Sequence, residues 1–171
     1  PNHEVMKLSR TGHTSWTLAE VAFTDGPYLA TNTTSTTLTP ASAGTGTGVN
    51  ITASAVTGIN GGAGFQTTDV GRIISFNSGK AKITSRTNTT VVVCTITTAF
   101  TNTNATEAFN LGAFSDTTGH PSCVSFFEQR LVFAGTTDEP QTLFFSKAGD
   151  YENMTTGTNA DDAMVYTIAS N

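Results

Sequence analysis

The sequence predicts an all-β protein, and three observations carry this prediction. Threonine and asparagine fill runs such as Thr31–Thr39 and Thr101–Thr106, and the β-branched threonine suits a half-exposed strand better than a helix. Short apolar segments are separated by turn signals rich in Gly, Asn, Asp and Pro. Apolar residues nowhere follow the helical period for longer than about two turns. We therefore expect very little helix, with a single short turn in Asp150–Thr156 as the candidate.

The N-terminal segment, residues 1–40, is predicted to hold strands and a connector. The stretch Trp16–Phe23 is strand-like and ends at Thr24–Pro27, whose Thr-Asp-Gly-Pro sequence is a strong turn signal. Because Trp16 lies within this strand-like stretch, we expect its ring to belong to a core.

Residues 41–104 predict a small antiparallel sandwich or barrel module. Val49 and Ile51 alternate with polar neighbours, as a half-buried strand does. Three strands with tight turns follow and make an antiparallel meander. Its strands and turns are the segment ending at Phe76, a turn at Asn77–Gly79, a strand at Lys80–Ser85, a turn at Thr87–Thr89 and a strand at Thr90–Thr97.

Residues 105–171 predict the start of a β-propeller-like sheet, with the polar run Thr101–Thr106 as the boundary before it. Phe109 and Leu111 alternate with polar neighbours. Successive short apolar strands then follow: Cys123–Phe127, Arg130–Ala134, Leu143–Phe145 and Met164–Ile168. A propeller needs at least about four blades, and the 171 residues hold one or two beside the meander. A lone blade leaves open sheet edges, so we expect the reading frame to extend beyond Asn171. A chain that starts at Pro1 also suggests an excerpt or a processed product.

The charge balance argues against a nucleic-acid groove. The formal net charge is −5, and the eight Lys and Arg residues are scattered, whereas DNA binding needs clustered cations. A weakly acidic wall is compatible with DNA passing through a pore without adhering to it. No apolar run reaches the length of a membrane helix, and the first residues do not show the basic region and apolar region typical of a signal peptide.

The two cysteines are predicted to be buried thiols. Cys94 lies in an apolar run and Cys123 beside Val124 and Phe126, contexts in which Cys acts as a small hydrophobe. A disulfide between them stays open, because sequence cannot place their Cα atoms within reach. Metal binding by two isolated cysteines is not expected.

No enzyme is predicted, and neither a cofactor nor a metal is assigned. The carboxylate pairs Asp138–Glu139 and Asp161–Asp162 are adjacent in sequence, so their side chains point apart rather than across a substrate. We read them as solvated loops, with calcium binding at Asp161–Asp162 as an alternative. The histidines, His3, His13 and His120, accompany no nucleophile motif.

The segment Gly119–Asn153 carries a family resemblance. It reads GHPSCVSFFEQRLVFAGTTDEPQTLFFSKAGDYEN and is followed by Asp161-Asp162-Ala163. It resembles a pattern of the nozzle proteins of short-tailed bacteriophages (tail tubular protein B): G-[YH]-P, then F-x-x-Q-R-L-x-F-x-G-T, P-Q-T, S-x-x-G-D-[YF]-x-N and D-D-A.

The resemblance extends upstream. Trp16-Thr17-Leu18 with Phe23–Tyr28 is similar to the family's W-x-L and F-x-D-G-P-Y stretch, and Asp69–Arg72 to its D-V-G-R segment. Phe109–Ala113 takes the place of a W-x-L-G-A element. The departures, Phe109 for Trp and Met154 for Phe, are apolar replacements.

The resemblance implies a non-enzymatic structural protein of the virion, in the phage tail. It implies a tail-tube component that oligomerises into a ring, a hexamer in the family, forming part of the DNA-ejection channel. Its partners would be copies of itself and other tail proteins such as the tail adaptor, with DNA only as passing cargo. The alternative is a tail adhesin that binds or hydrolyses carbohydrate. Such sites expose Trp and Tyr, and this chain has one Trp and three Tyr.

The motif residues are interpreted as structural, not catalytic. Arg130 is costly to bury unless it is paired, and Asp150 is its expected partner in a bidentate ion pair. Gly135 is expected to need a backbone angle that favours glycine, and Gly149 with Asp150 forms a turn. The structural motif set is Gln129, Arg130, Gly135, Pro140, Gly149 and Asp150.

Overall fold

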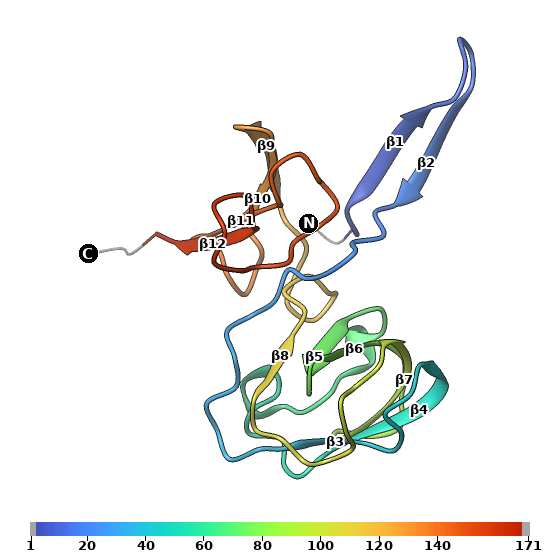
Figure 1. Cartoon of the computed structure of the whole chain (residues 1–171), viewed down its shortest axis with the longest axis vertical. Helices are drawn as coiled ribbons and strands as arrows, with labels where there is room; N and C mark the ends of the chain where they lie inside the picture. Colours follow the sequence, from blue (N-terminus) through green and yellow to red (C-terminus); the bar gives the residue numbers. More distant parts are fainter. Residues whose placement is uncertain (1–2, 169–171) are drawn as a thin grey trace. The chain divides into compact units, whose positions relative to one another are not determined.

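The computed structural model describes residues 3–168 and consists almost entirely of β-strands and loops (Figure 1). The all-β prediction is confirmed. The chain divides into two compact units: unit 1 combines the residues up to Pro27 with those from Thr118 onward, and unit 2 is Tyr28–Thr117. This division differs from the predicted segments 1–40, 41–104 and 105–171, because the N-terminal strands join the C-terminal ones. Within the described range no helix is long and apolar enough to span a membrane.

Unit 2 is one six-stranded antiparallel sheet that curls on itself (Figure 1). Its strand order is β3-β4-β7-β6-β5-β8. The bounds are β3 Leu38–Pro40, β4 Gly46–Ala53, β5 Ile73–Phe76, β6 Gly79–Arg86, β7 Val91–Thr98 and β8 Phe109–Leu111, with 3-10 turns η1 Asn60–Gly62 and η2 Thr67–Asp69. The predicted meander is β5-β6-β7 and is confirmed. Phe109–Leu111 pairs with β5. It is therefore the edge strand of this sheet and not the first strand of a propeller-like sheet.

The core of unit 2 follows from the two-residue period of its strands. Alternate residues of β5, β6 and β7 point inward and are buried. The cluster consists of Leu38, Ile51, Ala53, Ile59, Phe65, Ile74, Phe76, Ala81, Ile83, Val92, Cys94, Ile96, Phe100, Phe109 and Leu111. Asn77 and Ser78 both have positive φ, 45° and 58°, as the two central residues of a tight hairpin turn require.

A buried ion pair fixes the loop before β5. Arg72 Nη1 lies 3.0 Å from Asp69 Oδ1 and donates a hydrogen bond to Asn60 Oδ1 at 2.7 Å. Arg72 Nε donates to the Gly112 carbonyl at 2.6 Å, and Asp69 Oδ2 accepts from the Gln66 backbone N–H at 2.7 Å. The D-V-G-R segment therefore ties the η1–η2 loop to the end of β8.

Unit 1 contains a two-stranded hairpin and a four-stranded antiparallel sheet, here called the C-terminal sheet. The bounds are β1 Met6–Arg10, β2 Trp16–Glu20, β9 Cys123–Phe127, β10 Arg130–Ala134, β11 Thr142–Phe145 and β12 Met164–Thr167. The order β12-β11-β10-β9 is an up-and-down arrangement, compatible with a propeller blade. Glu128 and Gln129, with φ of 44° and 61°, form the two-residue turn between β9 and β10.

Three expectations about burial and local secondary structure are wrong in unit 1. Trp16 is 56% exposed, because the hairpin projects away from the C-terminal sheet (Figure 1). Cys123 is exposed on the edge strand β9, whereas Cys94 is buried as predicted. Asp150–Thr156 contains one hydrogen-bonded turn, from the Asn153 N–H to the Asp150 carbonyl at 3.3 Å, but no helix: Asp150 and Asn153 make isolated β-bridges.

Candidate interaction surface

Arg130 opens β10 and is buried. Its Nη1 donates to the carbonyl oxygens of Ser146 at 2.7 Å and Asp162 at 2.6 Å, and its Nη2 donates to that of Ala160 at 2.6 Å. Backbone carbonyls therefore compensate the buried guanidinium, and the expected ion pair with Asp150 does not form. Arg130 ties the start of β10 to the long connection between β11 and β12.

The acidic residues of that connection have other partners. Asp150 accepts a hydrogen bond from Asn153 Nδ2 at 3.1 Å. Lys147 Nζ lies 3.3 Å from Asp161 and 3.5 Å from Asp162. The hydrogen bond that Lys147 donates to Asp161 raises the pKa of Lys147. The pKa of Asp162 is lowered, first by the hydrogen bond from the Asn159 backbone N–H, which is 2.9 Å long. Hydrogen bonds within the connection are thus the first cause of both pKa shifts.

The remaining predicted motif residues lie at two ends of the C-terminal sheet. Gln129 accepts a hydrogen bond at its carbonyl from the Gly149 N–H at 2.8 Å, so these two lie at the same end as Arg130. Gly135 lies at the opposite end with φ of 73°, and a Cβ there would overlap the Ser122 hydroxyl. Pro140 lies in the exposed turn before β11. The motif residues therefore lie at both ends of the sheet.

Two motif stretches far apart in sequence meet at the edge of unit 1. The Thr24 N–H donates to the Glu152 carbonyl at 2.9 Å, and the Met154 N–H donates to the Asp25 carbonyl at 3.0 Å. Thr155 Oγ1 also donates to Asp25 Oδ2 at 2.9 Å. The D-G-P-Y stretch is thus paired with the end of the Gly119–Asn153 segment, which anchors the base of the hairpin.

One face of the C-terminal sheet, here called the covered face, packs against this N-terminal segment. Phe133 and Phe144 on β10 and β11 are buried. The ring of Phe23 meets Phe133 edge-on with centroids 5.9 Å apart. An apolar groove of about 530 Å³ runs between this face and the hairpin base, lined by Val5, Val21, Phe126 and Tyr151 among others.

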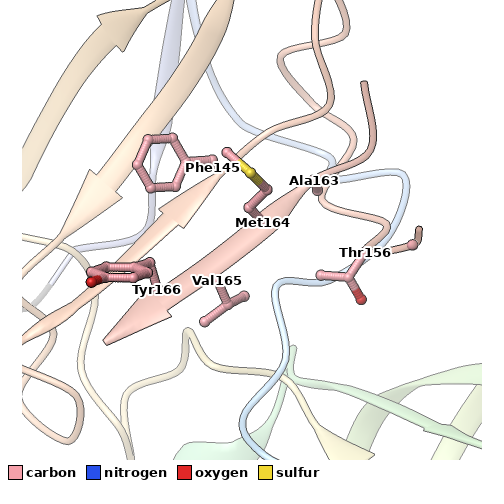
Figure 2. Close-up of a pocket in the computed structure, with 7 residues that line it drawn as sticks. Phe145, Thr156, Ala163, Met164, Val165 and Tyr166 are labelled. Atoms are coloured by element: carbon pink, nitrogen blue, oxygen red, sulfur yellow. The ribbon is translucent and has the colours of Figure 1, made fainter. Parts of the chain in front are cut away.

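The opposite face of the sheet, here called the open face, is also apolar. Directly opposed residues of antiparallel strands share a face, and the pairing register puts seven apolar residues there. They are Phe127, Val132, Ala134, Leu143, Phe145, Met164 and Tyr166. All are exposed or half-buried, and Tyr166 is 64% exposed. Figure 2 shows Phe145, Met164 and Tyr166 beside a cavity of about 610 Å³ at the β12 end.

The hairpin has one apolar and one polar face. Its register pairs Leu8 with Leu18 and Arg10 with Trp16, so Met6, Leu8, Trp16 and Leu18 share a face. These four side chains are 46% to 64% exposed. The Arg10 guanidinium lies 5.7 Å from the centre of the Trp16 ring, a cation–π contact. The other face carries Lys7, Ser9, Thr17 and Ala19.

Three of the four carboxylates considered as catalytic candidates have partners within the loops. Glu139 Oε2 accepts from Thr142 Oγ1 at 2.8 Å, and Asp161 and Asp162 face Lys147. Among residues 3–168, no three His, Cys, Asp or Glu side chains gather as a metal site would require.

The strongest candidate site is therefore the pair of exposed apolar faces in unit 1. Sequence reasoning missed the strand Met6–Arg10, although Met-Lys-Leu-Ser-Arg alternates as a strand does. It found the strands of the C-terminal sheet without noticing that both of its faces are apolar. No protein-family model and no curated protein matches the sequence at a significant level.

Proposed function

We propose that this chain is a structural component of a phage tail tube, a nozzle-type protein that assembles into a ring around the DNA-ejection channel. The observation that carries the proposal is the exposed apolar surface of unit 1 on the open face and the hairpin. Contiguous apolar surface of this kind marks a site of association. The resemblance of Gly119–Asn153 to the nozzle-protein pattern is the reason for proposing a tail-tube ring as the assembly.

The charge pattern supports DNA as passing cargo. The net charge of −5 repels phosphate weakly, and scattered cations give DNA no binding groove. Other tail proteins, the tail adaptor among them, and further copies of the chain are the proposed partners in the virion. A propeller-like ring of blades is the proposed setting of the C-terminal sheet.

A carbohydrate-binding or carbohydrate-hydrolysing adhesin is the second candidate, and one observation favours it. Trp16, Tyr151 and Tyr166 are all exposed, and exposed aromatic rings can stack on sugars. From the sequence we expect Trp16 to be buried, where its ring could not bind a sugar. Because Trp16 is exposed, that objection to an adhesin no longer applies.

Native mass spectrometry and electron microscopy of the purified chain test the proposal. We expect rings of one stoichiometry, six by family resemblance, and the same copy number when the chain is quantified in virions. A chain that stays monomeric at high concentration and is absent from purified virions would overturn the proposal. A monomer whose melting temperature rises with a host saccharide would establish the adhesin instead.

A further inference from the structure

We propose that the apolar face of the β1–β2 hairpin of one copy packs across the open face of the C-terminal sheet of the next copy. This inference rests on the proposed ring and names the contact that would close it. Three observations support it: the side of the C-terminal sheet from which the hairpin projects, the matching size of the two surfaces, and their charges.

The hairpin projects from the covered-face side of the C-terminal sheet. Its base is continuous with Val21 and Phe23, and Phe23 packs on Phe133 of the covered face. The groove beside the base is likewise lined by covered-face residues such as Phe126 and Leu131. The open face lies on the other side of the same sheet. Within one copy the hairpin is therefore directed away from the surface that matches it.

The two surfaces have matching dimensions and composition. Each hairpin strand has five residues and is about 16 Å long, while four strands span about 14 Å between the outer strand axes. One hairpin thus covers the width of the open face. An isolated two-stranded hairpin is at best marginally stable in water, so packing against another surface would stabilise it.

The charges of the two surfaces are complementary. Residues 118–168 carry seven carboxylates and two cations, a formal net charge of −5. Exposed Glu128 lies in the turn at one end of the open face, and exposed Asp138 lies in the loop at the other. The hairpin carries Arg10 on its apolar face near the tip and Glu20 on the same face at the base, so its tip is the positive end. Opposite charges at the rim of a contact fix its register and exclude wrong partners.

A contact between two different surfaces is head-to-tail and closes into a ring when the rotation per copy allows it. A second copy is therefore the occupant that we assign to the open face. Each copy would give its hairpin to one neighbour and receive a hairpin from the other.

Cysteine cross-linking tests the contact directly. Cys123 is exposed on the edge strand β9, in register with Ala134 of the open face and beside the groove at the hairpin base. Cys94 is buried with its pKa raised to about 12, so Cys123 alone reacts. We would introduce Leu18→Cys on the apolar face of the hairpin, with Thr17→Cys on its polar face as the matched control. A short bis-maleimide added to the assembled full chain should link Leu18→Cys into dimers and higher multiples. The control should stay at the wild-type background, and Cys123→Ser should abolish the ladder.

The outcomes separate this contact from the ring itself. An internally linked monomer would show that the hairpin covers its own sheet and would overturn the inference. Rings that form without a Leu18→Cys ladder would also overturn it and leave the proposed function standing. A wild-type chain that never forms a ring would contradict the proposed function itself, whatever the cross-linking shows.

A charge insertion gives a second readout. Leu8→Asp with Leu18→Asp should dissociate the ring and leave the melting temperature of the monomer close to wild type, because both side chains are exposed. Ser9→Asp with Thr17→Asp, on the polar face of the same strands, should leave the ring intact. Equal behaviour of the two double variants would contradict the proposed contact.

Discussion

At the scale of single residues, unit 1 depends on one side chain that serves several backbone segments. Arg130 donates to carbonyls from the end of β11 and from the loop before β12. A lysine, with one ammonium group, could not reach three such carbonyls in a fixed plane. The sequence correctly marked Arg130 as a buried cation that needs compensation. It could not show that the compensation comes from main-chain oxygens, because every residue type provides those.

Replacing Arg130 tests this arrangement. We expect Arg130→Met to lower the unfolding free energy of unit 1 by about 3 kcal/mol, because three carbonyl oxygens lose a charged donor. Asp150→Asn should change it by less than about 0.5 kcal/mol, as a surface substitution does. Urea unfolding, with hydrogen exchange of β10 and β11 to locate the effect, measures both. Equal losses of unfolding free energy in the two variants would instead support an ion pair between Arg130 and Asp150.

A second residue-scale prediction concerns pH and unit 2. Burial raises the pKa of the Cys94 thiol from 9.0 to about 12. Between these values the folded state keeps a proton that the unfolded state releases, so stability falls as pH rises, by about 1.4 kcal/mol per pH unit. Chemical unfolding from pH 8 upward should therefore show a steeper decline in the wild type than in Cys94→Ala. Parallel curves for the two proteins would contradict the prediction.

At the scale of elements, the turns are the best-predicted parts of the chain. The turn at Asn77–Gly79 forms as predicted, and Gly135 has the positive φ of 73° that was expected of it, because glycine is the residue that readily adopts that region. The meander strands were equally readable from their alternation. Strand partners were not: the pairing of Phe109–Leu111 with β5 depends on long-range contacts that leave no local pattern.

Two glycines of unit 1 allow backbone strain to be separated from a steric clash. Gly135 and Gly149 have nearly equal φ, 73° and 75°, but only at Gly135 would a Cβ meet a neighbouring atom, the Ser122 hydroxyl. Gly149→Ala should cost about 1 kcal/mol from the left-handed conformation alone. Gly135→Ala should cost clearly more, because Ser122 must also give up its hydrogen bond to the Gly135 carbonyl. Melting temperatures of the two variants compare the effects, and a smaller loss at Gly135 would count against this packing.

At the scale of the whole molecule, the two units differ in how completely they bury apolar surface. The large hydrophobic cluster lies wholly in unit 2, whereas unit 1 exposes the hairpin and the open face of its sheet. This asymmetry was not readable from composition, since exposed and buried strands of this chain have similar apolar content. It is also why the candidate interaction surface emerged only with the pairing register.

We expect the two units to unfold separately, with unit 2 the more stable. Residues 28–117 produced alone should melt in one cooperative transition, since their core and their sheet are complete within that range. In the full chain at low concentration, unit 1 should melt first, and its transition should rise with protein concentration if copies cover its apolar faces. Differential scanning calorimetry measures both. A single transition for the full chain, independent of concentration, would be the contrary result.

The bridge between Asp25 and Asn153 has a consequence for synthesis on the ribosome. Unit 2 lies between its two halves in the chain and can complete its core while the rest of unit 1 is still untranslated. The hairpin emerges early, but the segment that fixes its base emerges more than a hundred residues later. If copies associate as proposed, the base of the hairpin is fixed for that contact only after the segment around Asn153 has been synthesised.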